Sequence, residues 1–400
     1  MTKTELKNTK KQINFFTMRI IIAPDSFKEC LTANQVAAAI SEGIIRVVPE
    51  AKIIGIPVAD GGEGTVNALV EATGGKVIST STVDALNRPV ESFFGILGDG
   101  KTAVIEMAAA SGIELLTPEE RNPFITSTFG TGLLIKAAIE AGFTQIILAI
   151  GGSATNDGGA GMAQALGFGL LDKNRKSIGP GGGSLSKLHS IEHSHVHPML
   201  QKVKITVASD VRNPLLGPSG ATRVYGSQKG ATPEMIEKLE LNMSHYSQIL
   251  QQEFNVDIAE IPGAGAAGGL GAGLMTFCRA EMRSGFELIN KLTHLEDHIR
   301  QASLVFTAEG KIDSQTAIGK TISGVAQLAK KYHVPLIALA GIVKDDLTEL
   351  YNQGITSVFA IGSGPMSLVE SKAHAEELLS STSERIMRLV MNPLKKTTDL

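Results

Sequence analysis

The chain has 400 residues, a length that suits two or three domains or one large α/β unit. Hydrophobic residues make up 43% and charged residues 19%, which excludes disordered and fibrous classes. The 37 basic and 40 acidic residues give a net charge of −3, so the chain has no general field to attract a polyanion such as nucleic acid. Two cysteines, Cys30 and Cys278, are too few for a disulfide scaffold and indicate a reducing compartment.

Residues 1–17 contain lysines but no apolar stretch of signal-peptide length, so we expect a disordered tail there. No apolar stretch elsewhere reaches the length that a membrane span needs. We therefore expect a cytoplasmic protein that binds small molecules, without nucleic-acid or membrane partners. The sequence leaves open whether the protein forms a homodimer.

The chain begins with alternating strands and helices. An apolar strand at 19–24 precedes a helix that Thr32 can cap, and its apolar residues recur at spacings of three and four. A strand at 53–58, a Gly-rich turn and a helix at 65–73 repeat this plan, which is typical of parallel sheets.

In the middle of the chain, strands and helices no longer alternate. Strand-like runs follow one another from 76 to 106, with a hairpin signal at 98–100, and predict a mixed or antiparallel insert. A second α/β series follows, interrupted by a loop excursion at 172–201, and a long helix is predicted at 233–251.

From 303 onward the alternation returns and ends in a closing helix at 367–391. Because strands and helices alternate in the same way at both ends of the chain, we predict a discontinuous, Rossmann- or flavodoxin-like parallel-sheet domain built from 18–80 plus 285–392. A second, mixed α/β domain at 81–284 is inserted into it.

Polar residues follow many of the predicted strands. Parallel sheets bind ligands at the carboxyl ends of their strands, where helix N-termini favour anions. A single carboxylate there is more often a helix cap, but their number favours a site for phosphate and Mg²⁺. The carboxylates concerned are Asp25, Asp60, Glu63, Asp157, Asp210, Glu309 and Asp313.

The segment GGSATNDGGAG at 151–161 resembles a phosphate-binding loop more than a simple packing turn. Its glycines allow close approach to a ligand, and polar donors stand among them. The residues assigned to the nucleotide are Gly151, Gly152, Ser153, Thr155 and Asn156.

Two further segments partly match nucleotide-binding sequence motifs. Gly263, Gly265 and Gly268 form a GxGxxG, but the preceding strand is poor, which favours a packing or phosphate-facing loop over a dinucleotide site. SQTAIGKT at 314–321 misses the first Gly of a Walker A loop, although Lys320 can still contact a phosphate.

Taken together, the motifs resemble the bacterial glycerate kinase family over nearly all of 18–390. The matching blocks are APDSFKECLTA, PVADGGEGT, GGSATNDGGAGMAQALG, SDVRNPLLGPSGAT, VYGSQKGA, PGAGAAGGLGAG and EGKIDSQTAIGK. The chain departs from the family pattern at Glu29, Cys30, Ser227 and Ala308.

The resemblance implies phosphorylation of D-glycerate by ATP with Mg²⁺, and 2-phosphoglycerate is favoured over 3-phosphoglycerate. It implies catalytic roles for Lys28, Asp60 and Asp210, with either aspartate as base or metal ligand. Ser26, Lys28, Gln228 and Lys229 would bind the substrate, and Asp157, Glu309 and Asp313 the metal. The glycines at 151–152 and 263–268, with Lys320, would bind the nucleotide.

Two rival functions predict different chemistry. A nicotinamide-dependent oxidoreductase, suggested by GAGAAG at 263–268, would reduce nicotinamide with glycerate and consume no ATP. A non-catalytic sensor of small acids would bind glycerate without turnover.

Overall fold

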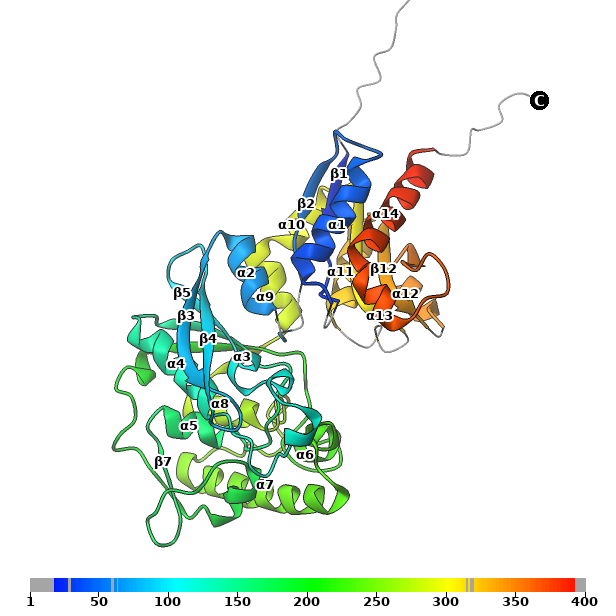
Figure 1. The fold of residues 1–400 in the computed structure, drawn as a ribbon. Helices are drawn as coiled ribbons and strands as arrows, with labels where there is room; N and C mark the ends of the chain where they lie inside the picture. Colours follow the sequence, from blue (N-terminus) through cyan, green and yellow to red (C-terminus); the bar gives the residue numbers. More distant parts are fainter. Residues whose placement is uncertain are drawn as a thin grey trace, which may run out of the picture.

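The structure is a computed structural model that describes residues 18–27, 30–58, 61–62, 64–313, 316, 320–344 and 346–392, with the backbone only of Lys320. The chain forms an upper and a lower α/β lobe, and both ends of the chain belong to the upper one (Figure 1). The α/β class predicted from the sequence is confirmed. The tail predicted at 1–17 lies outside the described residues.

The upper lobe is built on a parallel sheet with the order β13-β12-β11-β1-β2. Renumbered along this lobe, the order is 2-1-3-4-5, which is the flavodoxin arrangement. Its connections change direction between β1 and β11, and this switch point is where such sheets bind ligands. The strands are β1 (Arg19–Ile22), β2 (Lys52–Gly55), β11 (Leu304–Ile312), β12 (Leu336–Val343) and β13 (Ser357–Ala360).

Helices α1 (Ala33–Ile45) and α14 (Ala375–Met391) pack together over one face of this sheet. Thr32 caps α1 as predicted, because its hydroxyl accepts from Gln35 N while the Gln35 side chain accepts from Thr32 N. The closing helix predicted at 367–391 is instead two helices, α13 (Leu368–Ala373) and α14, which meet at His374. The upper lobe also contains α10 (Leu295–Arg300), α11 (Lys320–Lys331) and α12 (Thr348–Gln353).

The lower lobe is built on a mixed sheet with the order β10-β9-β6-β5-β4-β3. The pairs that join β3, β4 and β5 are antiparallel, and the others are parallel. Since β3 runs through residue 80, we propose that the inserted domain begins near Gly75 rather than at 81. The strands are β3 (Lys76–Val83), β4 (Pro89–Ile96), β5 (Thr102–Glu106), β6 (Gln145–Ala149), β9 (Lys204–Ala208) and β10 (Glu281–Arg283).

The excursion predicted as a loop at 172–201 contains regular structure. Its β8 (Ser190–Glu192) pairs with β7 (Gly169–Leu171) in a small antiparallel ladder. The long helix α7 (Pro233–Phe254) follows, and Thr232 caps it. The other helices of the lower lobe are α3 (Ala108–Ser111), α4 (Phe129–Glu140), α5 (Ala160–Ala165), α6 (Ala221–Tyr225) and α8 (Leu270–Phe277).

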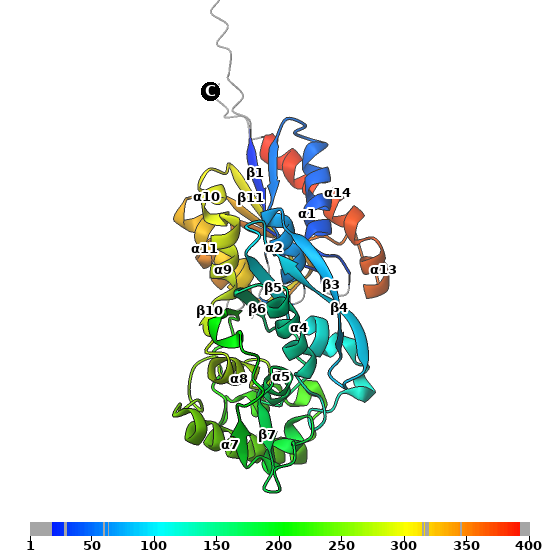
Figure 2. The same cartoon turned by 90° about the vertical axis from the view of Figure 1, so that its left-hand side faces the viewer.

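Helices α2 (Thr65–Thr73) and α9 (Gly285–Thr293) lie where the lobes meet, and both views show them between the sheets (Figure 2). The side chains of Leu69 and Ile289 belong to one buried cluster with Ile21 of the upper sheet and Val104 and Ile147 of the lower sheet. The lobes therefore share an apolar layer, which stabilises their arrangement through burial. Among the described residues, no helix has both the length and the apolar character that crossing a bilayer requires.

Gly43 provides a test of the contact between α1 and α14. A Cβ atom at this position would lie 2.1 Å from the carbonyl oxygen of Ser380. Helix propensity alone predicts that Gly43→Ala stabilises the protein by about 1 kcal/mol. We expect the opposite, a loss of about 1–3 kcal/mol measured by urea unfolding, because the helices must move apart. A gain in stability would contradict this packing. Ala38→Gly, on the exposed face of α1, serves as the propensity control.

Candidate active site

Residues predicted for the site gather at the switch point of the upper sheet. Asp25 follows β1, and its backbone N–H donates to Ala308 O at 2.8 Å, which fixes it beside β11. Ser26 N donates to the Asp25 carboxylate at 2.6 Å. On β11 and directly after it, Glu309 and Asp313 stand on either side of Lys311, whose Nζ lies 2.5 Å from the carboxylate of Asp313. Acidic and basic groups thus meet at one edge of the sheet.

Residues 25–27 and 30–31, here called the 25–31 hairpin, stand at this edge, and backbone hydrogen bonds join Phe27 to Leu31. The hairpin separates two cavities. The cavity on one side, here the α13 cavity, measures about 290 Å³ and is lined by the hairpin, the ends of β11 and β12, and α13. The cavity on the other side, here the α1–α2 cavity, measures about 210 Å³ and lies between those two helices. The predicted Lys28 lies outside the described residues.

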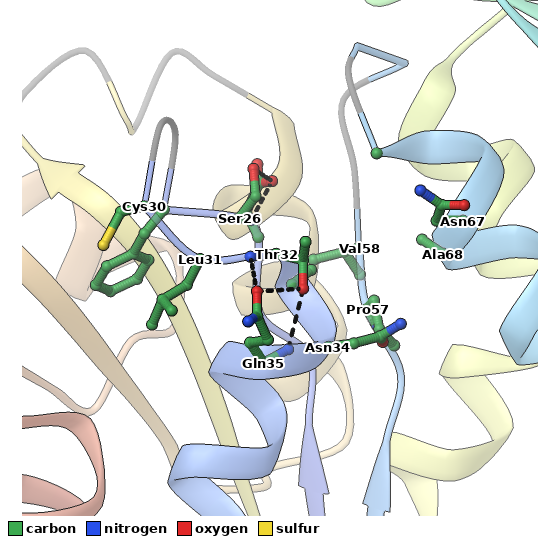
Figure 3. A pocket seen from close by; sticks show the side chains of 14 residues that line it. Ser26, Cys30, Leu31, Thr32, Asn34, Gln35, Pro57, Val58, Asn67 and Ala68 are labelled. Carbon is green, nitrogen blue, oxygen red and sulfur yellow. Dashed lines mark hydrogen bonds between the residues drawn. The ribbon is translucent and has the colours of Figure 1, made fainter. Parts of the chain in front are cut away.

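The α1–α2 cavity has a polar lining. Figure 3 shows Ser26 from the hairpin, Asn34 from α1 and Asn67 from α2 around it. Asn34 also donates a hydrogen bond to the Glu71 carboxylate of α2, which links the two helices. Hydroxyl and amide groups of this kind can hydrogen-bond a small hydroxy acid. Sequence analysis missed both asparagines, which lie inside helices rather than in a motif.

The turn after β2 joins the two lobes. Gly151 N, at the end of β6, donates to Gly61 O at 2.9 Å. Gly61 has a φ of +85°, and a Cβ there would lie 2.6 Å from Ala208 O at the end of β9. Position 61 therefore needs glycine, because a side chain would be strained at this φ and its Cβ would clash with Ala208. The Gly-rich motifs at 57–65 and 151–161 therefore meet in the described part of each, while Asp60 lies outside it.

Asp210 follows β9 and lines a third cavity, here the α9–α11 cavity, of about 810 Å³. This cavity lies between the lower lobe and helices α9 and α11. Arg212 and Ser323 line it together with Asp210. Asp210 thus lies at the junction of the lobes.

Glu106 is a buried carboxylate that sequence analysis missed. It ends β5, is 3% exposed, and accepts hydrogen bonds from Val66 N at 2.5 Å and from Gly64 N. These N–H groups start α2, whose N-cap is Gly64 and so has no side chain to cap them. Burial raises the pKa of Glu106 to about 7, although the two N–H donors lower it. A strand of the lower lobe thereby anchors the N-terminus of α2.

Asp157, predicted as a metal ligand, is fully buried at the start of α5. Its carboxylate accepts from Thr128 N at 2.8 Å, from the Thr128 hydroxyl at 2.9 Å, and from Gly159 and Gly161 N at 3.1 and 3.2 Å. Burial raises its pKa, and these donors lower it. Because protein donors surround both carboxylate oxygens, we propose that Asp157 stabilises the loop and does not bind the metal.

Lys229, predicted to bind the substrate, lies under the 151–161 loop and is 2% exposed. Its Nζ donates to Ser153 Oγ and to Thr155 O, each at 2.6 Å. Burial lowers the pKa of Lys229 to about 7, while the charge of Asp157 raises it. This geometry supports a role in shaping the loop. Gln228, its neighbour, is exposed.

The rest of the loop is also held by protein. The amide of Asn156 donates to the Thr222 hydroxyl at 3.0 Å. Asn156 Oδ1 and Thr155 Oγ1 are buried without a hydrogen-bond partner among the described residues. Gly151 and Gly152 are the more exposed part of this loop, and Gly151 lies beside Gly61 and Gly62. We therefore propose that any phosphate contact of this loop is made at Gly151 and Gly152.

The second Gly-rich loop faces protein. A Cβ at Gly265 would lie 2.1 Å from Pro214 O, and one at Gly268 would lie 1.9 Å from Thr155 O. Gly263 N and Gly265 N both donate to Asn213 O. These contacts support the packing interpretation of the GxGxxG and give no support to a nucleotide role for Gly263, Gly265 and Gly268. The side chain of Lys320 lies outside the described residues.

A model of the glycerate kinase family matches residues 20–391. The chain belongs to the glycerate kinase family. It is 50% identical over 369 residues to the glycerate kinase of Bacillus subtilis (strain 168), a match that covers 92% of this chain and 97% of that protein. It is 49% identical to the glycerate 2-kinase of Escherichia coli (strain K12), with the same shares covered. These matches confirm the resemblance and the prediction that the chain is an enzyme of this family.

A solved structure is similar over the whole fold. The "putative glycerate kinase 2" from Salmonella typhimurium LT2 superposes with a TM-score of 0.83 at 44% sequence identity. The match covers 94% of this chain and 98% of that one. The two-lobed arrangement is therefore shared with a relative.

The buried carboxylate Glu106 predicts a pH-dependent stability. Between pH 4.5 and about 7 the folded protein keeps a proton that the unfolded chain has lost, so this group makes stability fall as pH rises. Glutamine does not titrate. We expect the unfolding free energy of Glu106→Gln, relative to wild type, to rise between pH 5 and pH 8 by on the order of 3 kcal/mol. Urea unfolding at both pH values measures it. Parallel pH profiles would rule the effect out, and Glu114→Gln is the exposed control.

Lys229 gives a second prediction. Lys229→Met keeps most of the volume but leaves the Thr155 carbonyl and Ser153 Oγ without their donor. We expect a loss of about 2 kcal/mol in thermal or urea unfolding, because a buried acceptor is left unsatisfied. Lys238→Met, on the exposed face of α7, should change stability by less than about 0.5 kcal/mol. Equal effects of the two substitutions would refute the assigned role.

Proposed function

We propose that this protein transfers the γ-phosphoryl group of ATP to D-glycerate, with Mg²⁺, and yields 2-phosphoglycerate and ADP. A glycerate hydroxyl oxygen forms the new bond to phosphorus, the bond from the γ-phosphorus to the bridging oxygen breaks, and the hydroxyl proton passes to a base. Phosphorylation at the 2-position is supported by the name of the Escherichia coli relative, glycerate 2-kinase. The low cysteine count supports a cytoplasmic location.

The observation that carries this proposal is the pair of cavities on either side of the 25–31 hairpin at the switch point. Asp25 and Ser26 line both cavities. Two ligands held there would therefore meet over the same pair of residues. Phosphoryl transfer depends mainly on such positioning and on neutralising charge, which Lys311 can supply from the end of β11.

The donor set at this edge suits Mg²⁺. Magnesium is usually bound through one or two carboxylates, and it takes its remaining ligands from water and substrate phosphates. Asp25 and Glu309 line the same cavity, and Asp313 directly follows β11. We propose that Glu309 and Asp313 hold the ion, which would neutralise polyphosphate charge, with water and phosphate oxygens as its remaining ligands. Within the described residues, no group of three or more His, Cys, Asp or Glu side chains is placed to hold a metal ion.

Asp210 stays a proposal for the base. It lines the α9–α11 cavity and neither cavity beside the hairpin, so this role rests on the sequence and on the place of Asp210 at the lobe junction. Lys28 and Asp60, also predicted as catalytic, stay proposals from the sequence. Ser26 is proposed to bind glycerate, because it faces the polar α1–α2 cavity.

The activity can be tested directly. Purified full-length protein with Mg²⁺, ATP and D-glycerate should release ADP, and phosphorus NMR should show 2-phosphoglycerate. The 3-isomer would correct the regiochemistry only. Reduction of nicotinamide with glycerate, or glycerate binding without ATP consumption, would refute the kinase proposal in favour of an oxidoreductase or a sensor.

Asp210→Asn separates a base from a metal ligand. A base contributes about 10² to 10⁴ in rate, so we expect kcat to fall by that factor with KM for ATP and glycerate nearly unchanged. Loss of a metal ligand would instead raise the Mg²⁺ and ATP concentrations needed for half-maximal rate. Steady-state kinetics at several Mg²⁺ concentrations distinguishes the two. Asp257→Asn, on an exposed loop, is the control.

A further inference from the structure

The two cavities beside the 25–31 hairpin differ in chemistry. The α1–α2 cavity carries hydroxyl and amide side chains, among them Thr32, Asn34, Gln35 and Asn67. The α13 cavity has both charged residues and an apolar wall in its lining. That wall consists of Ile342 at the end of β12, Ile361 after β13 and Leu368 at the start of α13.

The apolar wall is unusually open to solvent. Leu368 is 62% exposed and Ile342 is 40% exposed, whereas Ile361 beside them is 1% exposed. Exposed large aliphatic side chains grouped in a concave site indicate a ligand that covers them. A planar heterocycle placed there would remove their surface from water.

Charged and hydroxyl groups line the α13 cavity at the switch point, and they belong to Asp25, Ser26, Glu309 and Lys311. Lys311 is the ladder partner of Ile342, so charged and apolar groups lie side by side in this cavity. An adenine nucleotide combines the same two kinds of group, a flat, weakly polar base and a polyphosphate. At about 290 Å³ the cavity lies near the lower end of small-molecule sites, so it suits a nucleoside better than a whole triphosphate.

We infer that the α13 cavity binds the adenosine half of ATP. The base lies against Ile342, Ile361 and Leu368, and the phosphates extend past Asp25 and Ser26 towards glycerate in the α1–α2 cavity. This assignment rests on the proposed function. It moves the nucleotide away from the Gly-rich loops at 151–161 and 263–268, whose interiors are filled by protein contacts.

The hairpin and α13 are also tied to each other. Cys30 Sγ donates to Lys372 O at 3.4 Å, so the hairpin and the end of α13 form connected walls of the cavity. Ser371 and Lys372 line it on this side and lie where a ribose or phosphate would pass. The site is therefore assembled from the first strand end and the last helices of the chain.

Leu368→Glu tests the inference, because Leu368 is exposed and its replacement does not disturb the core. The added carboxylate removes apolar contact and repels the nucleotide. We expect KM for ATP and the Kd of a fluorescent methylanthraniloyl-ATP to rise about tenfold or more, a change of 1.4 kcal/mol per factor of ten. KM for D-glycerate should change less than about twofold. Val369→Glu, 78% exposed and outside the cavity lining, adds the same charge as a control.

Equal effects of the two substitutions, or unchanged nucleotide affinity in Leu368→Glu, would overturn the inference. A photolabel, 2-azido-ATP, gives a second measurement on the wild-type protein. Crosslinks to the peptide 361–375 support the assignment, and crosslinks to 209–212 or 283–290 would move the base to the α9–α11 cavity and overturn it.

The two proposals fail in different ways. If the wild-type protein phosphorylates glycerate but Leu368→Glu retains its ATP affinity, only the nucleoside site is wrong. If the wild-type protein binds the fluorescent nucleotide at this wall and turns over no glycerate, only the kinase proposal is wrong. Absence of nucleotide binding by the wild-type protein would reject both.

Discussion

The contact between the turn after β2 and the ends of β6 and β9 is the constraint on which the site depends. There a Cβ at Gly61 would lie 2.6 Å from Ala208 O, and a Cβ at Gly151 would lie 2.6 Å from Gly62 Cα, so neither glycine has room for one. A hydrogen bond from Gly151 N to Gly61 O closes the contact. Because β2 belongs to the upper sheet and β6 to the lower, this single contact brings the carboxyl edges of two separate sheets together. Glu106 strengthens it by holding the start of α2 from the lower lobe.

Local signals predicted much of the fold. Thr32 followed by Gln35 marks a capping box, and the helix begins where that pair predicts. Gly74 ends α2 with a left-handed backbone, as a C-terminal glycine should. The helices over Gly285–Arg300 are not among the predicted elements, and the segment predicted as a loop at 172–201 contains β8, which pairs with β7. Short elements of this kind depend on tertiary packing, which a local pattern does not contain.

The candidate site was predicted less well than the fold, for a physical reason. Lys229 stands in a charged, Gly-flanked motif that is typical of ligand contacts, yet the fold buries its ammonium under a loop. The same holds for Asp157. Its place in the sequence is typical of a ligand contact, but the fold buries its carboxylate among hydrogen-bond donors of the protein. Residue type and spacing predict which groups lie near a strand end. Solvent access to those groups is decided by segments far away in the chain, such as Thr128 and Gln228–Lys229.

The pairing of β1 with β11 also bears on how the protein folds during its synthesis. Ile20 pairs with Leu304, so the upper sheet lacks its central partner strand until about three quarters of the 400-residue chain has been made. The strands of the lower lobe, from Lys76 to Arg283, form one contiguous stretch and can assemble first. Before β11 is made, β1 has only β2 as a ladder partner. Closure of the upper sheet is therefore a long-range step, and long-range strand pairing is slow.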